Sequence, residues 1–194
     1  MDLITVDAPR RDPIRLSPDA AQAMFDELQP CAPPALSGRW VGREVHTGHP
    51  LDGALANVSW YGKQFDGPDR VHPLVVADAA GNPFPLNPAV VPMLLISHPV
   101  RTPGFVKWVV PTLMPTAMSL LRSAVSARGY GARLQVVTHR GVATAAMSYN
   151  DRPVVDFFRA VDEDIVLGSM EYPGMPRPHF FVLQRDNRGD TSVR

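Results

Sequence analysis

Few side chains in this sequence are placed to transfer protons. Asp156 stands in an apolar run, where a carboxylate needs a partner. Glu44 and His46 share one face of an expected strand. Burial shifts the pKa of a catalytic acid or base, so these three residues are the candidates for proton transfer. Arg152 and Arg159 are the expected partners of Asp156, whose role stays open between a structural ion pair and the polar contact of a pocket.

A second set of side chains could contact a ligand without reacting. Lys63 is one of two lysines in the chain, and it would either hold an anionic head group or lie at the surface. The aromatic residues around it are typical of a core, a rim or a ligand cage. The expected ligand-binding residues are Trp40, Trp60, Tyr61, Lys63, Phe65, Asp156, His179 and Arg185.

The sequence gives little support for a metal site or for a nucleophilic cysteine. The spacing His46-x-x-His49-x-x-Asp52 could bring three ligands together, but Gly48 and nearby glycine and proline residues indicate a turn. Cys31 is the only cysteine, and no motif around it suggests an activated thiol. We therefore predict neither a metal site nor a resident cofactor.

Composition narrows the class of protein. The chain has 194 residues, 45% of them hydrophobic, and a formal net charge of zero. Such a chain is long enough for one domain with a sizeable core, and its neutrality argues against a nucleic-acid binder. The 21 prolines argue against a helix bundle.

The expected location is the cytoplasm. A single cysteine requires no oxidising compartment, and the first residues lack the basic start of a secretory signal. The two most hydrophobic stretches, 86–100 and 105–125, are interrupted by prolines and charged residues, so no transmembrane span is predicted. A hydrophobic small molecule is the expected partner, and a homodimer stays open.

The start of the chain predicts an arm and a helix. Residues 1–16 are polar and are expected to form a flexible arm before a single domain over 17–194. Ser17 and Pro18 supply an N-cap and a proline at the first helical position, and Pro30 ends the short helix.

Short apolar runs separated by turn residues predict an all-β domain after that helix. The regular part, 130–186, is expected to be an antiparallel meander, because its turns are too short for any other connection. Its expected strands are 133–139, 142–149, 153–161, 165–170 and 179–185. The looser half, 17–115, is expected to hold strands near 39–46, 54–60, 71–77, 91–96 and 105–110. Residues 116–127 predict a short helix.

Several motifs together resemble one family. Residues 38–42 read Gly-Arg-Trp-Val-Gly, and further matching stretches are 47–53, 60–65, 71–74, 149–159 and 166–168. They are similar to the bacterial and fungal family named for its GXWXG motif, which pairs this region with a C-terminal domain of unknown function. The resemblance covers about residues 17–186. It implies a fold more than a reaction, because no established activity accompanies it.

A Gly-x-Trp at the start of the first strand also resembles barrels of the calycin type. In such barrels a cationic residue of the last strand often packs across the indole, so we expect Arg185 to lie against Trp40. The predicted fold is a mostly β, antiparallel up-and-down β-barrel, calycin-like, with a short N-terminal helix. A partly open barrel of the pleckstrin-homology type is the alternative.

This fold predicts the binding of a hydrophobic small molecule, such as a lipid or an isoprenoid-like compound. Small residues of the stretch 143–148 would either leave space inside the barrel or belong to an ordinarily packed barrel interior. An isomerase, cyclase or lyase that uses a buried carboxylate or histidine is the alternative, so enzymatic activity stays open. A nitrobindin-like haem site with His179 as proximal ligand is a third hypothesis.

Overall fold

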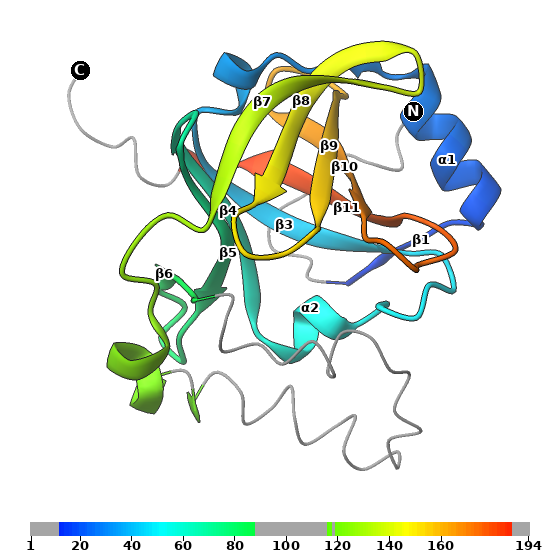
Figure 1. The fold of residues 1–194 in the computed structure, drawn as a ribbon. Helices are drawn as coiled ribbons and strands as arrows, with labels where there is room; N and C mark the ends of the chain where they lie inside the picture. Colours follow the sequence, from blue (N-terminus) through cyan, green and yellow to red (C-terminus); the bar gives the residue numbers. More distant parts are fainter. Residues whose placement is uncertain (1–11, 88–115, 118, 188–194) are drawn as a thin grey trace.

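The computed structural model describes residues 12–87, 116–117 and 119–187. Strands dominate it, with short helical segments beside them (Figure 1). In chain order the elements are β1 (Ile14–Arg15), α1 (Pro18–Glu27), β2 (Gln29–Pro30), the 3-10 helix η1 (Pro33–Leu36), β3 (Gly38–His46), α2 (Ala54–Asn57), β4 (Trp60–Gly67), β5 (Arg70–Ala77), β6 (Pro83–Pro85), β7 (Ala132–His139), β8 (Val142–Tyr149), β9 (Val155–Ala160), β10 (Ile165–Glu171) and β11 (His179–Arg185).

Helix α1 begins where the sequence predicts. The side chain of Ser17 accepts a hydrogen bond from the backbone of Ala20 at 3.2 Å, and Pro18 takes the first helical position. The prediction of a flexible arm over residues 1–16 is wrong for the last residues of that range. Ile14 and Arg15 form β1, which pairs in parallel with β3, because the backbone of the end of β3 offers hydrogen bonds to it.

The sheet forms a ring in which strands that follow one another in sequence lie side by side. Its path runs β3–β11–β10–β9–β8–β7–β5–β4, and β4 pairs again with β3. These pairings are antiparallel, so the predicted mostly β, up-and-down architecture is confirmed. The junction between β5 and β7 is the thinnest, with one paired position, Val71 with Ala132.

The front half of the chain departs from the sequence prediction at 54–60, and it contains two strands that were not predicted, most of β4 and the short β6. The expected strand 54–60 is instead α2 followed by the start of β4. Gly53 has a left-handed φ of 84°, and Glu44 accepts hydrogen bonds from backbone N–H groups of this turn, which favours a helical start over a strand. The expected strands 91–96 and 105–110 lie outside the described residues. Residues 119–125 are helical, in agreement with the helix expected there.

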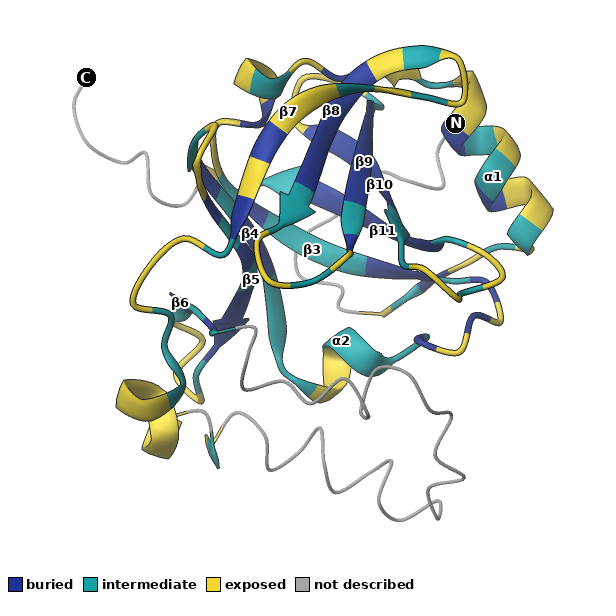
Figure 2. Ribbon diagram, in the orientation of Figure 1, coloured by how far each residue is buried: buried dark blue, intermediate teal, exposed yellow. Residues whose placement is uncertain are grey.

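Two apolar cores lie on the two faces of the ring. The inner core lies in the space enclosed by the strands, which we call the lumen, and includes Trp40, Phe65, Phe158, Phe181 and Leu183. The outer core packs α1 against the outside of β8 to β11 and β3 (Figures 1 and 2). It includes Phe25, Val45, Ala146, Phe157 and Phe180. In the described residues, none of the helices has the length and apolar character needed to span a bilayer.

The sequence prediction expected the small residues of β8 to leave space in the lumen. Only some of these residues face it. Ala145 belongs to the inner core and Ala146 to the outer one, because successive residues of a strand point to opposite faces. Space inside the ring therefore depends on fewer small side chains than expected.

The second glycine of the Gly-x-Trp-x-Gly motif has a packing reason. A Cβ atom at Gly42 would overlap the indole ring of Trp60. Gly168 plays the same part on β10, where a Cβ would overlap the ring of Phe181. These glycines let two large rings lie flat against the lumen wall.

Candidate functional site

One end of the lumen is closed by Trp40 and Arg185. The guanidinium carbon of Arg185 lies 4.4 Å from the centre of a Trp40 ring, and the two residues are paired across β3 and β11. This contact confirms the expected pairing of the first and last barrel strands. A guanidinium over an indole contributes about 0.5–2 kcal/mol.

Backbone carbonyls of η1 complete this closed end, which comprises Leu36, Trp40 and Arg185. Arg185 donates to the carbonyl oxygens of Ala35 and Ser37, each at 2.9 Å, and its Nε donates to Asp164 at 2.8 Å. The indole N–H of Trp40 donates to the carbonyl of Leu36 at 2.8 Å. The end of a short helix therefore has its free carbonyls satisfied by side chains.

Aromatic rings line the middle of the lumen. Phe158 lies edge-on to Phe65 at 5.8 Å and to Phe181 at 6.2 Å between ring centres. Trp60 continues the series, edge-on to Phe181 at 5.8 Å. These edge-to-face contacts join the two ends of the lumen through an apolar layer.

A buried ion pair lies beside the aromatic layer, and its Lys63 is the cross-strand partner of Trp40. Lys63 Nζ is 2.8 Å from Asp156 Oδ2, and the two side chains are 4% and 0% exposed. The ammonium also donates to the carbonyl of Pro73 at 3.0 Å. Arg159 is not the partner of Asp156 that the sequence predicted, because it points to the outer face, over the ring of Phe25. The surface role considered for Lys63 is also wrong.

Three aromatic rings surround the ammonium of Lys63. The ring centres of Phe181, Tyr149 and Trp60 lie 4.9, 5.8 and 5.9 Å from Nζ. Lys63 is thus held by a carboxylate, a carbonyl and π faces, a combination that offsets the cost of removing an ammonium from water.

Burial controls the electrostatics of this polar end, which comprises Lys63, Tyr149, Asp156, Met170 and His179. Burial raises the pKa of Asp156, and the neighbouring Lys63 ammonium opposes that rise. The pKa of Tyr149 is raised well above 10 by burial and by the charge of Asp156. Oδ1 of Asp156 has no hydrogen-bond partner among the described residues.

Several side chains at the rim of the polar end are partly exposed, as Arg185 is at the closed end, where 29% of its side chain is exposed. Trp60, Tyr149 and Met170 pack against the inner core but are only partly buried. Trp40 and Leu36, in contrast, are fully buried. Solvent therefore reaches the rim of the lumen on the side of the ion pair.

His179 lies on the same row of side chains as Asp156. Met170 is paired with both residues across β9, β10 and β11, so all three face the lumen. Nε2 of His179 is 3.8 Å from a carboxylate oxygen of Glu44 and 3.9 Å from one of Asp52. Burial, helped by nearby histidines and Lys63, lowers the pKa of His179 to about 3. Carboxylates, rather than an open apolar slot for a haem, face its Nε2.

The other polar residues of this region stabilise the backbone. Glu44 accepts hydrogen bonds from the backbone N–H groups of Gly53 and Leu55 at 3.1 and 3.3 Å, and burial raises its pKa. Nε2 of His46 lies 3.6 Å from the second oxygen of Glu44. Of the three proton-transfer candidates, only Asp156 lies at the ion pair inside the lumen.

The spacing His46-x-x-His49-x-x-Asp52 folds into a turn. Nδ1 of His49 accepts from the backbone of Leu51 at 3.1 Å, and its Nε2 donates to the carbonyl of Arg177 at 3.1 Å. Asp52 accepts from the backbone of His49 at 3.0 Å. Within the described ranges, no group of three or more His, Cys, Asp or Glu residues could hold a metal ion.

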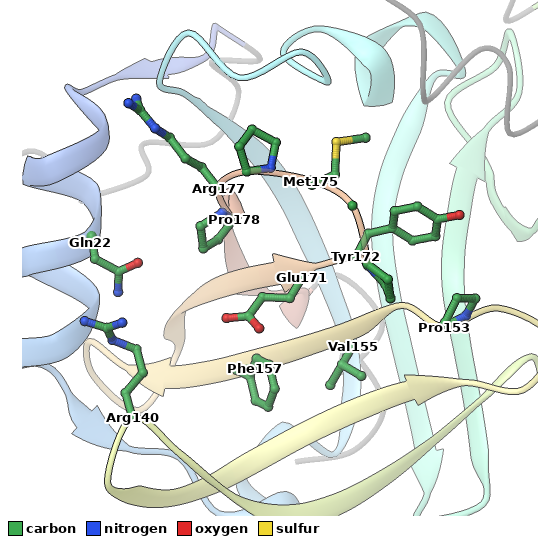
Figure 3. A pocket seen from close by; sticks show the side chains of 13 residues that line it. Gln22, Arg140, Pro153, Val155, Phe157, Glu171, Tyr172, Met175, Arg177 and Pro178 are labelled. Atoms are coloured by element: carbon green, nitrogen blue, oxygen red, sulfur yellow. The ribbon is translucent and has the colours of Figure 1, made fainter.

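A groove on the outside of the ring is a second place where a molecule could bind (Figure 3). Its volume is about 530 Å³, its floor is Val155 and Phe157 of β9, and one wall is the proline-rich loop after β10. Its main charged groups already have partners. Arg140 pairs with Asp26 at 2.7 Å, and Glu171 lies 2.8 Å from a ring nitrogen of His139.

The structure places the expected ligand-binding residues in four parts of the fold. Lys63, Asp156 and His179 lie at the polar end with Trp60 beside them, whereas Trp40 and Arg185 form the closed end and Phe65 belongs to the aromatic layer. Tyr61 lies elsewhere, since its hydroxyl donates to Asp186 at 2.7 Å beside Arg39.

Tyr149 and Met170 are the polar-end residues that the sequence reasoning missed. Tyr149 has the same strand parity as Ala145 and Met147, which are both in the inner core. Parity could therefore have placed it in the lumen once the face of β8 was fixed. Met170 could have been found in the same way from Val166 on β10.

Two family descriptions match the chain. Residues 23–81 match the GXWXG protein family, and residues 130–185 match a domain of unknown function (DUF4334). The chain thus combines a GXWXG region with a DUF4334 domain. Both matched regions contribute to the ion pair, since Lys63 comes from the first and Asp156 from the second.

A solved structure supports the fold of this GXWXG chain. The crystal structure of a protein from Thermomonospora curvata is 26% identical to it and has a TM-score of 0.64. The match covers 89% of this chain and 89% of that one. No curated protein matches the chain.

Proposed function

We propose that this protein binds a hydrophobic small molecule, such as a lipid or an isoprenoid-like compound, inside the lumen. The observation that carries the proposal is the buried Lys63–Asp156 pair, at 2.8 Å, among three aromatic rings. Charges buried in an apolar interior cost several kcal/mol each to desolvate, as an order of magnitude. A pair of hydrophobic residues would stabilise the fold at least as well, so we attribute the pair to the orientation of a ligand.

The partly exposed rim supports entry from the polar end. Trp60, Tyr149 and Met170 are apolar or aromatic residues that retain contact with solvent. Ligand sites are commonly apolar cavities with a few polar groups that fix orientation. The polar end has this composition, whereas Arg140 and Glu171 of the outer groove already pair with Asp26 and His139.

The binding of N-phenyl-1-naphthylamine, a neutral apolar fluorophore, tests this proposal. Met170→Trp enlarges the side chain that is paired with Asp156 and should weaken the binding of the fluorophore about tenfold. Val155→Trp is the matched control, because it adds the same indole to the floor of the outer groove. It should leave the affinity within about twofold.

Thermal unfolding of both variants shows whether each is folded before affinity is compared. Loss of fluorophore binding in Val155→Trp with full binding in Met170→Trp would move the site to the outer groove. Absence of saturable binding to the unmodified protein, together with no co-purified ligand in native mass spectrometry, would remove the proposal.

A proton-transfer enzyme, an isomerase, cyclase or lyase, is the second candidate. The raised pKa of Asp156 favours it, because burial brings the carboxyl closer to the pH at which it can both accept and return a proton. In this scheme Asp156 removes a proton from carbon next to a carbonyl, and the Lys63 ammonium stabilises the enolate oxygen.

Deuterium exchange distinguishes this candidate from simple binding. 2-Undecanone in D₂O should gain deuterium next to its carbonyl faster with the protein than with buffer, and Asp156→Asn should abolish the gain. Glu171→Gln, which changes a carboxylate of the outer groove, is the control. Exchange no faster than in buffer would leave binding alone. The cytoplasm and a homodimer stay predictions and carry no part of either scheme.

A further inference from the structure

The Lys63–Asp156 pair leaves one hydrogen-bonding position unused. The ammonium of Lys63 contacts Asp156 Oδ2 and the carbonyl of Pro73 and is otherwise enclosed by rings. Asp156 is 0% exposed, and its Oδ1 has no hydrogen-bond partner in the part of the chain that the structure describes. A buried acceptor without a donor costs about 1–3 kcal/mol, so this atom selects for a donor.

The charge of the pair limits what that donor can be. The pair is neutral as a whole, so a ligand carboxylate would place a second anion beside Asp156. A ligand ammonium would place a second cation beside Lys63. Both arrangements bury an uncompensated charge in an apolar space. A neutral hydroxyl satisfies Oδ1 without adding charge.

We propose that the ligand is an apolar alcohol whose hydroxyl donates a hydrogen bond to Oδ1 of Asp156. This inference rests on the proposed function and names the class of its ligand. The chain of the alcohol would lie along the partly buried rings of Trp60 and Tyr149. A hydrogen bond to a charged acceptor is stronger than a neutral one, so the hydroxyl should contribute measurably to affinity.

A head-group series tests the inference on the unmodified protein. Displacement of N-phenyl-1-naphthylamine is measured with 1-decanol, decyl methyl ether, decanoate and decylamine, all below their aggregation concentrations. 1-Decanol should bind about tenfold more tightly than the ether, which accepts but cannot donate a hydrogen bond. Decanoate and decylamine should bind more weakly than 1-decanol.

A variant that removes the charge of Asp156 should change the order of the ligand affinities, which is an independent test. Asp156→Asn leaves the Lys63 ammonium without a counterion, so decanoate should become the preferred ligand of that variant. Glu171→Gln, in the outer groove, should keep the order of the unmodified protein. If Asp156→Asn does not fold, the head-group series alone decides.

Equal affinities for all four head groups would overturn the inference and leave the binding proposal intact. A preference for decanoate or decylamine in the unmodified protein would overturn it as well. Displacement by none of the four, with no binding of the fluorophore itself, would remove both proposals together.

Discussion

The two ends of the lumen bury cationic side chains in different ways. Arg185, at the closed end, is 29% exposed and donates to carbonyls of η1. Lys63, at the polar end, is 4% exposed and depends on a single carboxylate for its charge. Arg185 satisfies three backbone carbonyls, whereas Lys63 satisfies one, that of Pro73, and has a carboxylate partner that is itself fully buried.

The contrast between the two cationic residues indicates which part of the ring can carry function. Arg185 has many partners, so its role in structure is sufficient to explain it. The ion pair joins β4 to β9, two strands that are not neighbours in the ring. It therefore holds opposite walls of the lumen together and leaves a carboxylate oxygen between them.

The largest expected effect comes from breaking the polar end. Lys63→Met leaves a buried carboxylate unpaired and should lower the free energy of unfolding by about 3–5 kcal/mol. The double variant Lys63→Met/Asp156→Leu removes both charges and should recover most of that loss. Guanidinium unfolding at pH 7.5 measures both variants. A single variant within about 1 kcal/mol of the unmodified protein would mean that the pair is not truly buried.

A smaller loss is expected from opening the closed end. Arg185→Met removes the cation over Trp40 and the donors to the carbonyls of Ala35 and Ser37. We expect a loss of about 2 kcal/mol in unfolding free energy. Affinity for 1-decanol, measured in the same preparation, should stay unchanged. A loss of that affinity at unchanged stability would place the ligand at the closed end and contradict binding at the polar end.

His179 predicts a pH dependence of stability at the polar end. Its pKa falls from an ordinary 6.5 to about 3 in the fold, so the unfolded chain binds a proton that the folded one excludes. The contribution of neutral His179 to the free energy of unfolding is complete above pH 6.5 and is lost as pH falls towards 3. Between pH 7.5 and 5.5 the expected loss is about 1.4 kcal/mol.

Unfolding of His179→Gln at both pH values checks this assignment. The variant should lose about 1.4 kcal/mol less than the unmodified protein over the same interval. Glu44, Asp52 and His49 face this ring, and His49 also has a lowered pKa, so part of the slope should persist. An unchanged slope would assign the acid sensitivity to those neighbours instead.

The smallest expected effect lies outside the lumen. Arg140 lowers the pKa of Asp26, so this pair stabilises the fold above the ordinary pKa of an aspartate and weakens as pH falls. Asp26→Asn should cost only about 0.5 kcal/mol at pH 7.5, because the pair is exposed. Thermal unfolding measures it, and a cost comparable to that of Lys63→Met would remove the contrast between surface and lumen pairs.

The sequence predicted the regular parts of this fold well. Strand alternation and short turns located the C-terminal strands, and Gly-x-Trp with a terminal arginine located the closed end. Both depend on local patterns or on one specific resemblance. The stretch 54–60 failed because α2 depends on Glu44, a residue distant in sequence that binds its backbone.

The polar end was predicted only in part. Lys63 and Asp156 were both named, yet their mutual contact joins strands whose register no local pattern fixes. Arg159 was misleading, because it lies three residues from Asp156 on β9 and residues an odd number apart on a strand face opposite sides. Strand parity, applied consistently, would have added Tyr149 and excluded Arg159.

The most direct test of the account is a nuclear Overhauser experiment between 1-decanol and the isotope-labelled protein. Binding at the polar end predicts contacts from the alcohol to the rings of Trp60 and Tyr149, and none to Trp40 at the closed end. Contacts confined to Val155 and Phe157 of the outer groove, or to the ring of Trp40, would contradict the account.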